Sequence, residues 1–226
     1  AQMEKMNDGV LVLVGDMDET KVKKTLVQYV GGFRTREGVF GRTIVHYQPV
    51  SGWMTYNVEG NRDAVVVAMS ARLPMTADNY LAADIAAMYL KEVMHNELAP
   101  LGLKVNISKS RRIYPEDRFS VMLLVEGDDM PEDIMRMIRA ALAKAEAERP
   151  DNAYMAAVKA YCKNIYDIDM KEPSYWLHAV AMRYLDGKDF TTGYASKIDA
   201  VTPAKVCDIL TLLGDGSKVE YKIDKR

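Results

Sequence analysis

The stretch from Ala77 to Leu98 carries the longest regular pattern of hydrophobic and polar positions in the chain. Hydrophobic residues occupy most of the circumference of a helix drawn through it. The polar residues form one narrow stripe, which comprises Asp84, Lys91 and His95. A helix with so wide a hydrophobic surface is buried between a sheet and other helices. The pattern therefore predicts a central, buried helix over residues 77–98.

A strand is predicted after this helix, because Pro100 ends the helix and Gly102 allows a turn. Leu103, Val105 and Ile107 alternate with polar residues, which is typical of a strand with one buried face. Similar reasoning predicts further strands at 10–14, 43–48, 53–58, 64–73, 119–126 and 218–223. It predicts further helices at 19–30, 131–150, 152–171, 174–185 and 203–213.

Polar residues ahead of several helices predict their N-caps. Thr76 precedes the central helix, and Thr202 stands before Pro203 at the start of the last helix. Asp129 with Glu132 three residues later resembles a capping box. These signals place three helix starts to within a residue or so.

The order of these elements indicates the fold class. A strand and a helix come first, and then three strands, the central helix, two strands, several helices and a final strand. The strict alternation of strand and helix that is typical of a parallel sheet is missing. The sequence therefore predicts an α+β fold, with a mainly antiparallel sheet and helices packed on one face.

Composition and charge are those of an ordinary globular protein. The chain has 226 residues, of which 49% are hydrophobic and 27% are charged, and its formal net charge is −2. This balance argues against nucleic acid as a partner, and no hydrophobic run reaches the length of a membrane-spanning segment. Cys162 and Cys207 match no metal or redox spacing and leave the cellular compartment open. The first residue is not methionine, so we interpret the chain as a mature product or as a piece of a longer protein.

The three histidines, His46, His95 and His178, stand far apart in the sequence. A zinc site needs several nitrogen or sulfur ligands that converge, often two histidines four residues apart on a helix. We therefore expect no metal ligands and no catalytic residues in this chain.

Two carboxylates follow the hydrophobic run at 10–14 in the phrase VGDMDET. Asp16 at the end of a strand and Asp18 two residues later resemble the opening motif of phosphatases that use an aspartate nucleophile with Mg²⁺. Glu19, however, stands where that family has glycine. The alternative interpretation is that the two aspartates cap the helix at 19–30 and complement its dipole.

Several phrases, in their order, resemble the pitrilysin/insulinase-type zinc metallopeptidases and their relatives. They begin with GVLVLVGDMDETKVKKTLVQYVGGF, continue through LGLKVNIS, and end with Tyr194 and the phrase IDAVTPAKV that starts at Ile198. The resemblance implies the α+β repeat of that family. It also implies that residues 1–35 are the strand–helix tail of a preceding repeat, and that residues 43–226 form one repeat.

The catalytic repeat of that family carries the motif His-x-x-Glu-His, which this sequence lacks. The resemblance therefore implies a non-catalytic repeat, with zinc in the catalytic repeat of the parent protein. An upstream catalytic half or another peptidase-like repeat is the implied partner, and a peptide is the implied substrate. The same resemblance also fits a non-catalytic domain of an inactive relative. A structural or interaction subunit of a larger assembly is the alternative.

Active relatives place an arginine and a tyrosine that reach the substrate at positions matching Leu98 and Val105 in this sequence. The apolar replacements leave two interpretations, a packing surface toward a partner or a part of this domain's own core. Nearby polar and charged residues are predicted to face the partner: Asn106, Ser108, Lys109, Arg111 and Arg112.

Overall fold

The computed structural model describes residues 10–32 and 52–225. Two compact units divide the chain. One contains residues 46–164 and 192–226, and the other contains residues 1–45 and 165–191. The strand predicted at 43–48 lies outside the described residues.

The unit of residues 46–164 and 192–226 is built on one five-stranded sheet. Its strands are β1 (Trp53–Gly60), β2 (Ala64–Arg72), β3 (Lys104–Arg112), β4 (Arg118–Glu126) and β5 (Ser217–Lys225). They lie in the order β1-β5-β2-β4-β3, and only β1 and β5 run parallel to each other. The predicted α+β fold with a mainly antiparallel sheet is therefore confirmed.

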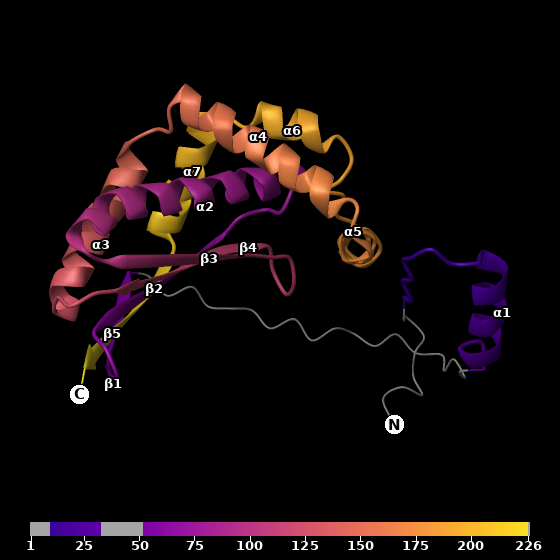
Figure 1. Cartoon of the computed structure of the whole chain (residues 1–226), viewed down its shortest axis with the longest axis horizontal. Helices are drawn as coiled ribbons and strands as arrows, with labels where there is room; N and C mark the ends of the chain where they lie inside the picture. Colours follow the sequence, from indigo (N-terminus) through magenta and orange to yellow (C-terminus); the bar gives the residue numbers. More distant parts are fainter. Residues whose placement is uncertain (1–9, 33–51, 226) are drawn as a thin grey trace. The chain divides into compact units, whose positions relative to one another are not determined.

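Helices cover one face of this sheet, as Figure 1 shows for α2 (Ala77–Leu98), α3 (Pro131–Ala147) and α7 (Pro203–Asp215). The other helical segments of the described residues are α1 (Glu19–Tyr29), η2 (Ala99–Leu101), α4 (Asn152–Asp169), α5 (Pro173–Asp186) and α6 (Tyr194–Ala200). Within the described part of the chain, no helix combines the length and the apolar character that crossing a membrane requires.

The central helix is α2, at the position that the hydrophobic pattern predicts. It packs against α3, α6, α7 and β3. Thr76 caps its first turn, because the Thr76 hydroxyl accepts a hydrogen bond from the Asn79 amide at 3.2 Å. Eleven of its side chains are buried, and Ile85, Leu90 and Met94 are among the largest in the core. Burial on several sides explains why the polar stripe of this helix is narrow.

The two faces of the sheet follow from the alternation of side chains along each strand. In β4, Phe119, Val121, Leu123 and Val125 are buried beneath the helices. Met122 points to the opposite face and is exposed. Alternation of this kind is what a sheet needs when helices cover only one face.

The structure corrects the predicted strand at 10–14. Val10, Leu11 and Leu13 belong to no strand, and 45–57% of their surface is exposed. A strand is defined by hydrogen bonds to a neighbouring strand, and a hydrophobic, β-branched run does not supply that neighbour. Among the described residues, no strand pairs with this segment.

Two smaller predictions also differ from the structure. The residue that caps α3 is Met130, without a side-chain hydrogen bond, so the predicted capping box of Asp129 with Glu132 is wrong. Pro131 occupies the first turn, where its missing N–H is not needed. The short helix α6 was not predicted, because only Ile198 in it is buried and one buried side chain produces no periodic pattern.

Candidate functional site

Leu98 and Val105, the two positions that the family resemblance singled out, lie on the helix side of the sheet. Leu98 ends α2 and is 1% exposed. Val105 in β3 lies opposite the buried Val125 of β4, and therefore points to the helix-covered face. In this structure Leu98 is a core side chain.

The five predicted partner-facing residues of β3 divide between the two faces of the sheet. Side chains alternate along the strand, so Asn106, Ser108 and Arg112 point away from the helices, whereas Lys109 and Arg111 point toward α2. The first three are the ones that lie on the face without helices in the described structure.

Lys109 and Arg111 converge on one carboxylate of α2. Both form ion pairs with Asp84, and the Arg111 Nη1 lies 2.5 Å from Asp84 Oδ2. The Arg111 guanidinium also lies 3.7 Å from the centre of the Tyr80 ring. Burial raises the pKa of the Tyr80 phenol, so this ring stays uncharged beside the ions. These basic side chains tie β3 to α2.

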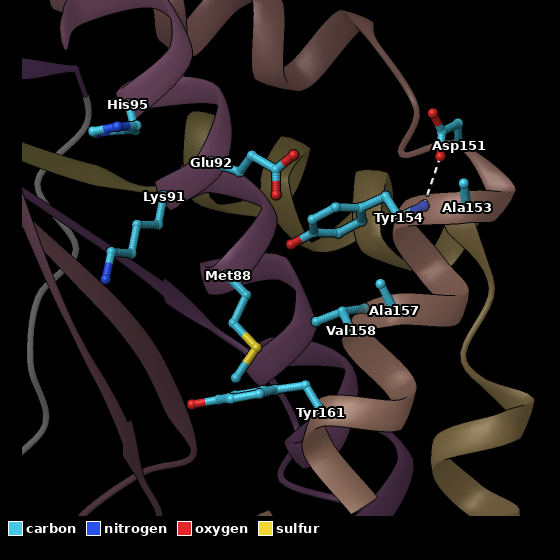
Figure 2. A pocket seen from close by; sticks show the side chains of 10 residues that line it. All are labelled: Met88, Lys91, Glu92, His95, Asp151, Ala153, Tyr154, Ala157, Val158 and Tyr161. Carbon is cyan, nitrogen blue, oxygen red and sulfur yellow. Dashed lines mark hydrogen bonds between the residues drawn. The ribbon is translucent and has the colours of Figure 1, made fainter. Parts of the chain in front are cut away.

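An open groove of about 890 Å³ separates the N-terminal half of α4 from α2 (Figure 2). Both walls belong to the same compact unit. The residues that line it are Met88, Lys91, Glu92, His95, Asp151, Ala153, Tyr154, Ala157, Val158 and Tyr161. The floor is apolar and the rim carries charges of both signs. An apolar surface with a few polar groups beside it is a common feature of ligand sites.

The α4 wall of the groove is ordered by its helix cap. Asp151 Oδ1 accepts a hydrogen bond from the Tyr154 amide at 2.7 Å, which satisfies one of the free N–H groups of the first turn. The Tyr154 ring packs edge-on against Tyr89, with 5.4 Å between the ring centres. Burial raises the pKa of the Tyr154 phenol, and the negative charge of Glu92 raises it further. Tyr154 is therefore an uncharged, well-positioned ring.

No metal centre is assembled from the described residues, among which no three histidine, cysteine or acidic side chains cluster. His95 lies on the rim of the groove, His178 lies in α5, and His46 lies outside the described residues. Cys162 and Cys207 are free thiols, and burial raises the pKa of both. The described side chains do not fit a zinc site.

Asp18, half of the phosphatase-like pair, caps α1. Its side chain accepts a hydrogen bond from the Lys21 amide at 3.1 Å and pairs with the Lys21 ammonium at 3.4 Å. Asp16 is exposed and precedes the helix. Since residues 10–14 form no strand, Asp16 does not stand at the carboxyl end of one. The structure supports the capping interpretation for Asp18.

The groove and the Asp84 cluster were not predicted from the sequence. Each joins residues that are far apart in the chain, and each depends on the pairing of α2 with a later element. The only local signal was the polar stripe of α2, which contains Asp84, Lys91 and His95. The sequence pattern showed where this stripe lies, but it did not show which residues of other elements the side chains of the stripe contact.

Comparison with solved structures relates the fold to peptidases. A protease from Helicobacter pylori superposes with a TM-score of 0.77 at 14% identity, over 93% of this chain and 54% of that one. A predicted insulinase family protease from Yersinia pestis gives 0.67 at 13% identity, over 94% and 51%. A peptidase M16 inactive domain from Pseudomonas fluorescens gives 0.66 at 12% identity, over 92% and 52%.

The sequence itself matches no family model and no curated protein. The chain spans about half the length of the three structures just described. At identities this low, structural similarity is evidence for the fold alone. The chain therefore has the α+β fold found in insulinase-type peptidases, including a domain described as inactive.

Proposed function

We propose that this chain is a non-catalytic repeat of a pitrilysin/insulinase-type zinc metallopeptidase, or of an inactive relative. The observation that carries the proposal is the fold, which this chain shares with peptidase structures over more than nine-tenths of its length. One of these structures is described as an inactive domain. The missing His-x-x-Glu-His motif fits this role. The unclustered histidines and thiols of the described part fit it as well.

In this proposal, zinc and peptide hydrolysis belong to another repeat of the parent protein. The neighbours are about twice as long as this chain, which leaves room for a further repeat. This chain contributes a packed scaffold and a surface toward that repeat. Peptide is the proposed substrate class of the whole protein.

We further propose that residues 1–35 complete a preceding repeat, whereas residues 43–226 form the repeat itself. Two observations support this division. The hydrophobic residues Val10, Leu11 and Leu13 are exposed, and α1 has no buried side chain. Exposed hydrophobic segments of this kind are typical of surfaces that another domain covers.

The proposed partner-facing residues of β3 are Asn106, Ser108 and Arg112, which share the face opposite the helices. Lys109 and Arg111 belong to the same proposal only indirectly, because Asp84 holds both. Lys109 and Arg111 hold β3 against α2, and β3 is the strand that carries Asn106, Ser108 and Arg112.

A structural subunit of a larger assembly is the second candidate, and the absence of the zinc motif from this sequence favours it equally. A phosphatase that uses Asp16 and Asp18 has no supporting observation, because Asp18 caps α1. The candidates differ in the activity of the parent protein.

Activity assays on two proteins separate these candidates: the product of the whole reading frame that contains this sequence, and the 226-residue chain alone. We expect the longer product to hydrolyse an unstructured reporter peptide and the chain alone to leave it intact. Hydrolysis by the chain alone would contradict the proposal. A longer product without peptidase activity would favour the structural subunit. Hydrolysis of an aryl phosphate that is lost in Asp16→Asn would establish the phosphatase.

A further inference from the structure

An arginine of this protein is held between an aromatic ring and a carboxylate of α2. The Arg111 guanidinium lies over the Tyr80 ring, 3.7 Å from its centre, and donates to Asp84 Oδ2 at 2.5 Å. The negative face of the ring attracts the cation, and the carboxylate accepts its N–H groups. Tyr80 and Asp84 are four residues apart, so one face of the helix presents both.

A second arginine is held in the same manner near the opposite edge of the sheet, where β1 and β5 lie. Arg139 of α3 lies 4.8 Å from the centre of the Trp53 ring and donates to Glu220 Oε2 at 2.8 Å. The planar guanidinium suits this arrangement, because it stacks on a ring and still directs its N–H groups at a carboxylate. A ring beside a carboxylate is thus a repeated arginine site in this fold.

The groove between α2 and α4 presents a third carboxylate beside aromatic rings. Figure 2 shows Glu92 of α2 and Tyr154 of α4 pointing into the groove, with Tyr161 about two turns further along α4. Glu92 pairs with no cation among the described residues. Lys91 and His95, its neighbours on the same helix, point away from α4 in Figure 2.

We propose that this groove binds the side chain of an arginine from a peptide segment of another protein. The guanidinium would pair with Glu92 and stack on Tyr154, as Arg111 does with Asp84 and Tyr80. Glu92 contributes to the raised pKa of the Tyr154 phenol, so its negative charge acts on the ring. This inference does not depend on the proposed function.

Charge and shape both favour arginine over other occupants. Glu92 points into the groove whereas Lys91 points away from α4, so an anionic side chain in the groove would face the negative charge of Glu92. A purely hydrophobic side chain would take water away from Glu92 without supplying a hydrogen bond. The aliphatic part of an arginine fits the apolar floor, which Met88 and Val158 provide.

Titration of the isotope-labelled 226-residue chain with the peptide acetyl-Gly-Arg-Gly-amide tests this proposal. We expect amide shifts confined to residues 88–95 and 151–161. The same peptide with citrulline in place of arginine keeps the shape and loses the charge, and we expect it to bind several-fold more weakly. Equal binding of both peptides, or shifts that avoid the groove, would overturn the proposal.

Variants of two glutamates on α2 provide the matched control. Because ion pairs at partly exposed sites are modest, we expect Glu92→Gln to weaken arginine-peptide binding by about three- to tenfold. Glu97 already pairs with Lys144 at 2.6 Å, so Glu97→Gln should leave binding unchanged. An equal effect of the two substitutions would show that the interaction is only a general attraction to negative charge, and would refute the site.

Discussion

Substitution of Leu98 by arginine is expected to destabilise strongly the unit that contains the sheet. Leu98 is 1% exposed at the end of α2, and a guanidinium at this position would be buried without a partner. An uncompensated buried charge costs about 3 kcal/mol or more of the free energy of unfolding. Chemical denaturation followed by circular dichroism measures the loss as a shift of the midpoint to lower urea concentration.

Leu101 offers the matched control for this substitution. It lies three residues further along in η2 and is 54% exposed, so an arginine there remains in water. We expect Leu101→Arg to change the free energy of unfolding by less than about 0.5 kcal/mol. If Leu98→Arg denatured at the same urea concentration as Leu101→Arg, Leu98 would not be a core residue, and the partner-surface interpretation would stand.

Because Leu98 is buried, the proposed partner surface has to be tested at other positions. A variant of Leu98 changes folding and association together, so it reports on neither alone. Asn106 and Ser108 are exposed on the face without helices, so a substitution at either position leaves the core intact.

The second large effect is expected at Arg139, which neutralises a buried carboxylate. Glu220 is 1% exposed in β5 and has two partners, Arg139 at 2.8 Å and the Thr55 hydroxyl at 2.6 Å. Arg139→Ala leaves the carboxylate with the hydroxyl alone. Arg139 is itself half-exposed, so water replaces part of the lost interaction, and we expect a loss of about 2–3 kcal/mol.

Arg136, one turn earlier on α3, is the control for this prediction. It is exposed and pairs with Asp133 on the same helix, an arrangement that contributes about 0.3–0.5 kcal/mol. If the buried charge is the cause, Glu220→Gln should recover part of the stability lost in Arg139→Ala. Equal losses in Arg136→Ala and Arg139→Ala, or no recovery by Glu220→Gln, would contradict this account.

Local patterns predicted the elements of the fold well. The helix at 77–98 has the bounds of α2, because its periodicity and its Thr76 cap are properties of neighbouring residues. The strand at 119–126 differs from β4 by one residue, because four buried side chains alternate within it. Both elements can therefore be predicted from their own residues alone.

Features that depend on distant residues were not predictable in the same way. The strand order places β5, the last strand, between β1 and β2, and no local signal indicates this position. The run at 10–14 has the composition of a strand, but its pairing requires a neighbour that composition does not show. The groove beside Glu92 arises only when α4 is positioned against α2.

The zinc content of the purified 226-residue chain tests most directly the central claim, that this is a non-catalytic repeat without a metal site of its own. Structural and catalytic zinc in proteins is bound tightly enough to survive dialysis. After loading with zinc and extensive dialysis, we expect elemental analysis to find far less than one zinc ion per chain. A stoichiometric zinc ion that remains bound, and is lost when His95 or His178 is replaced by alanine, would contradict the claim.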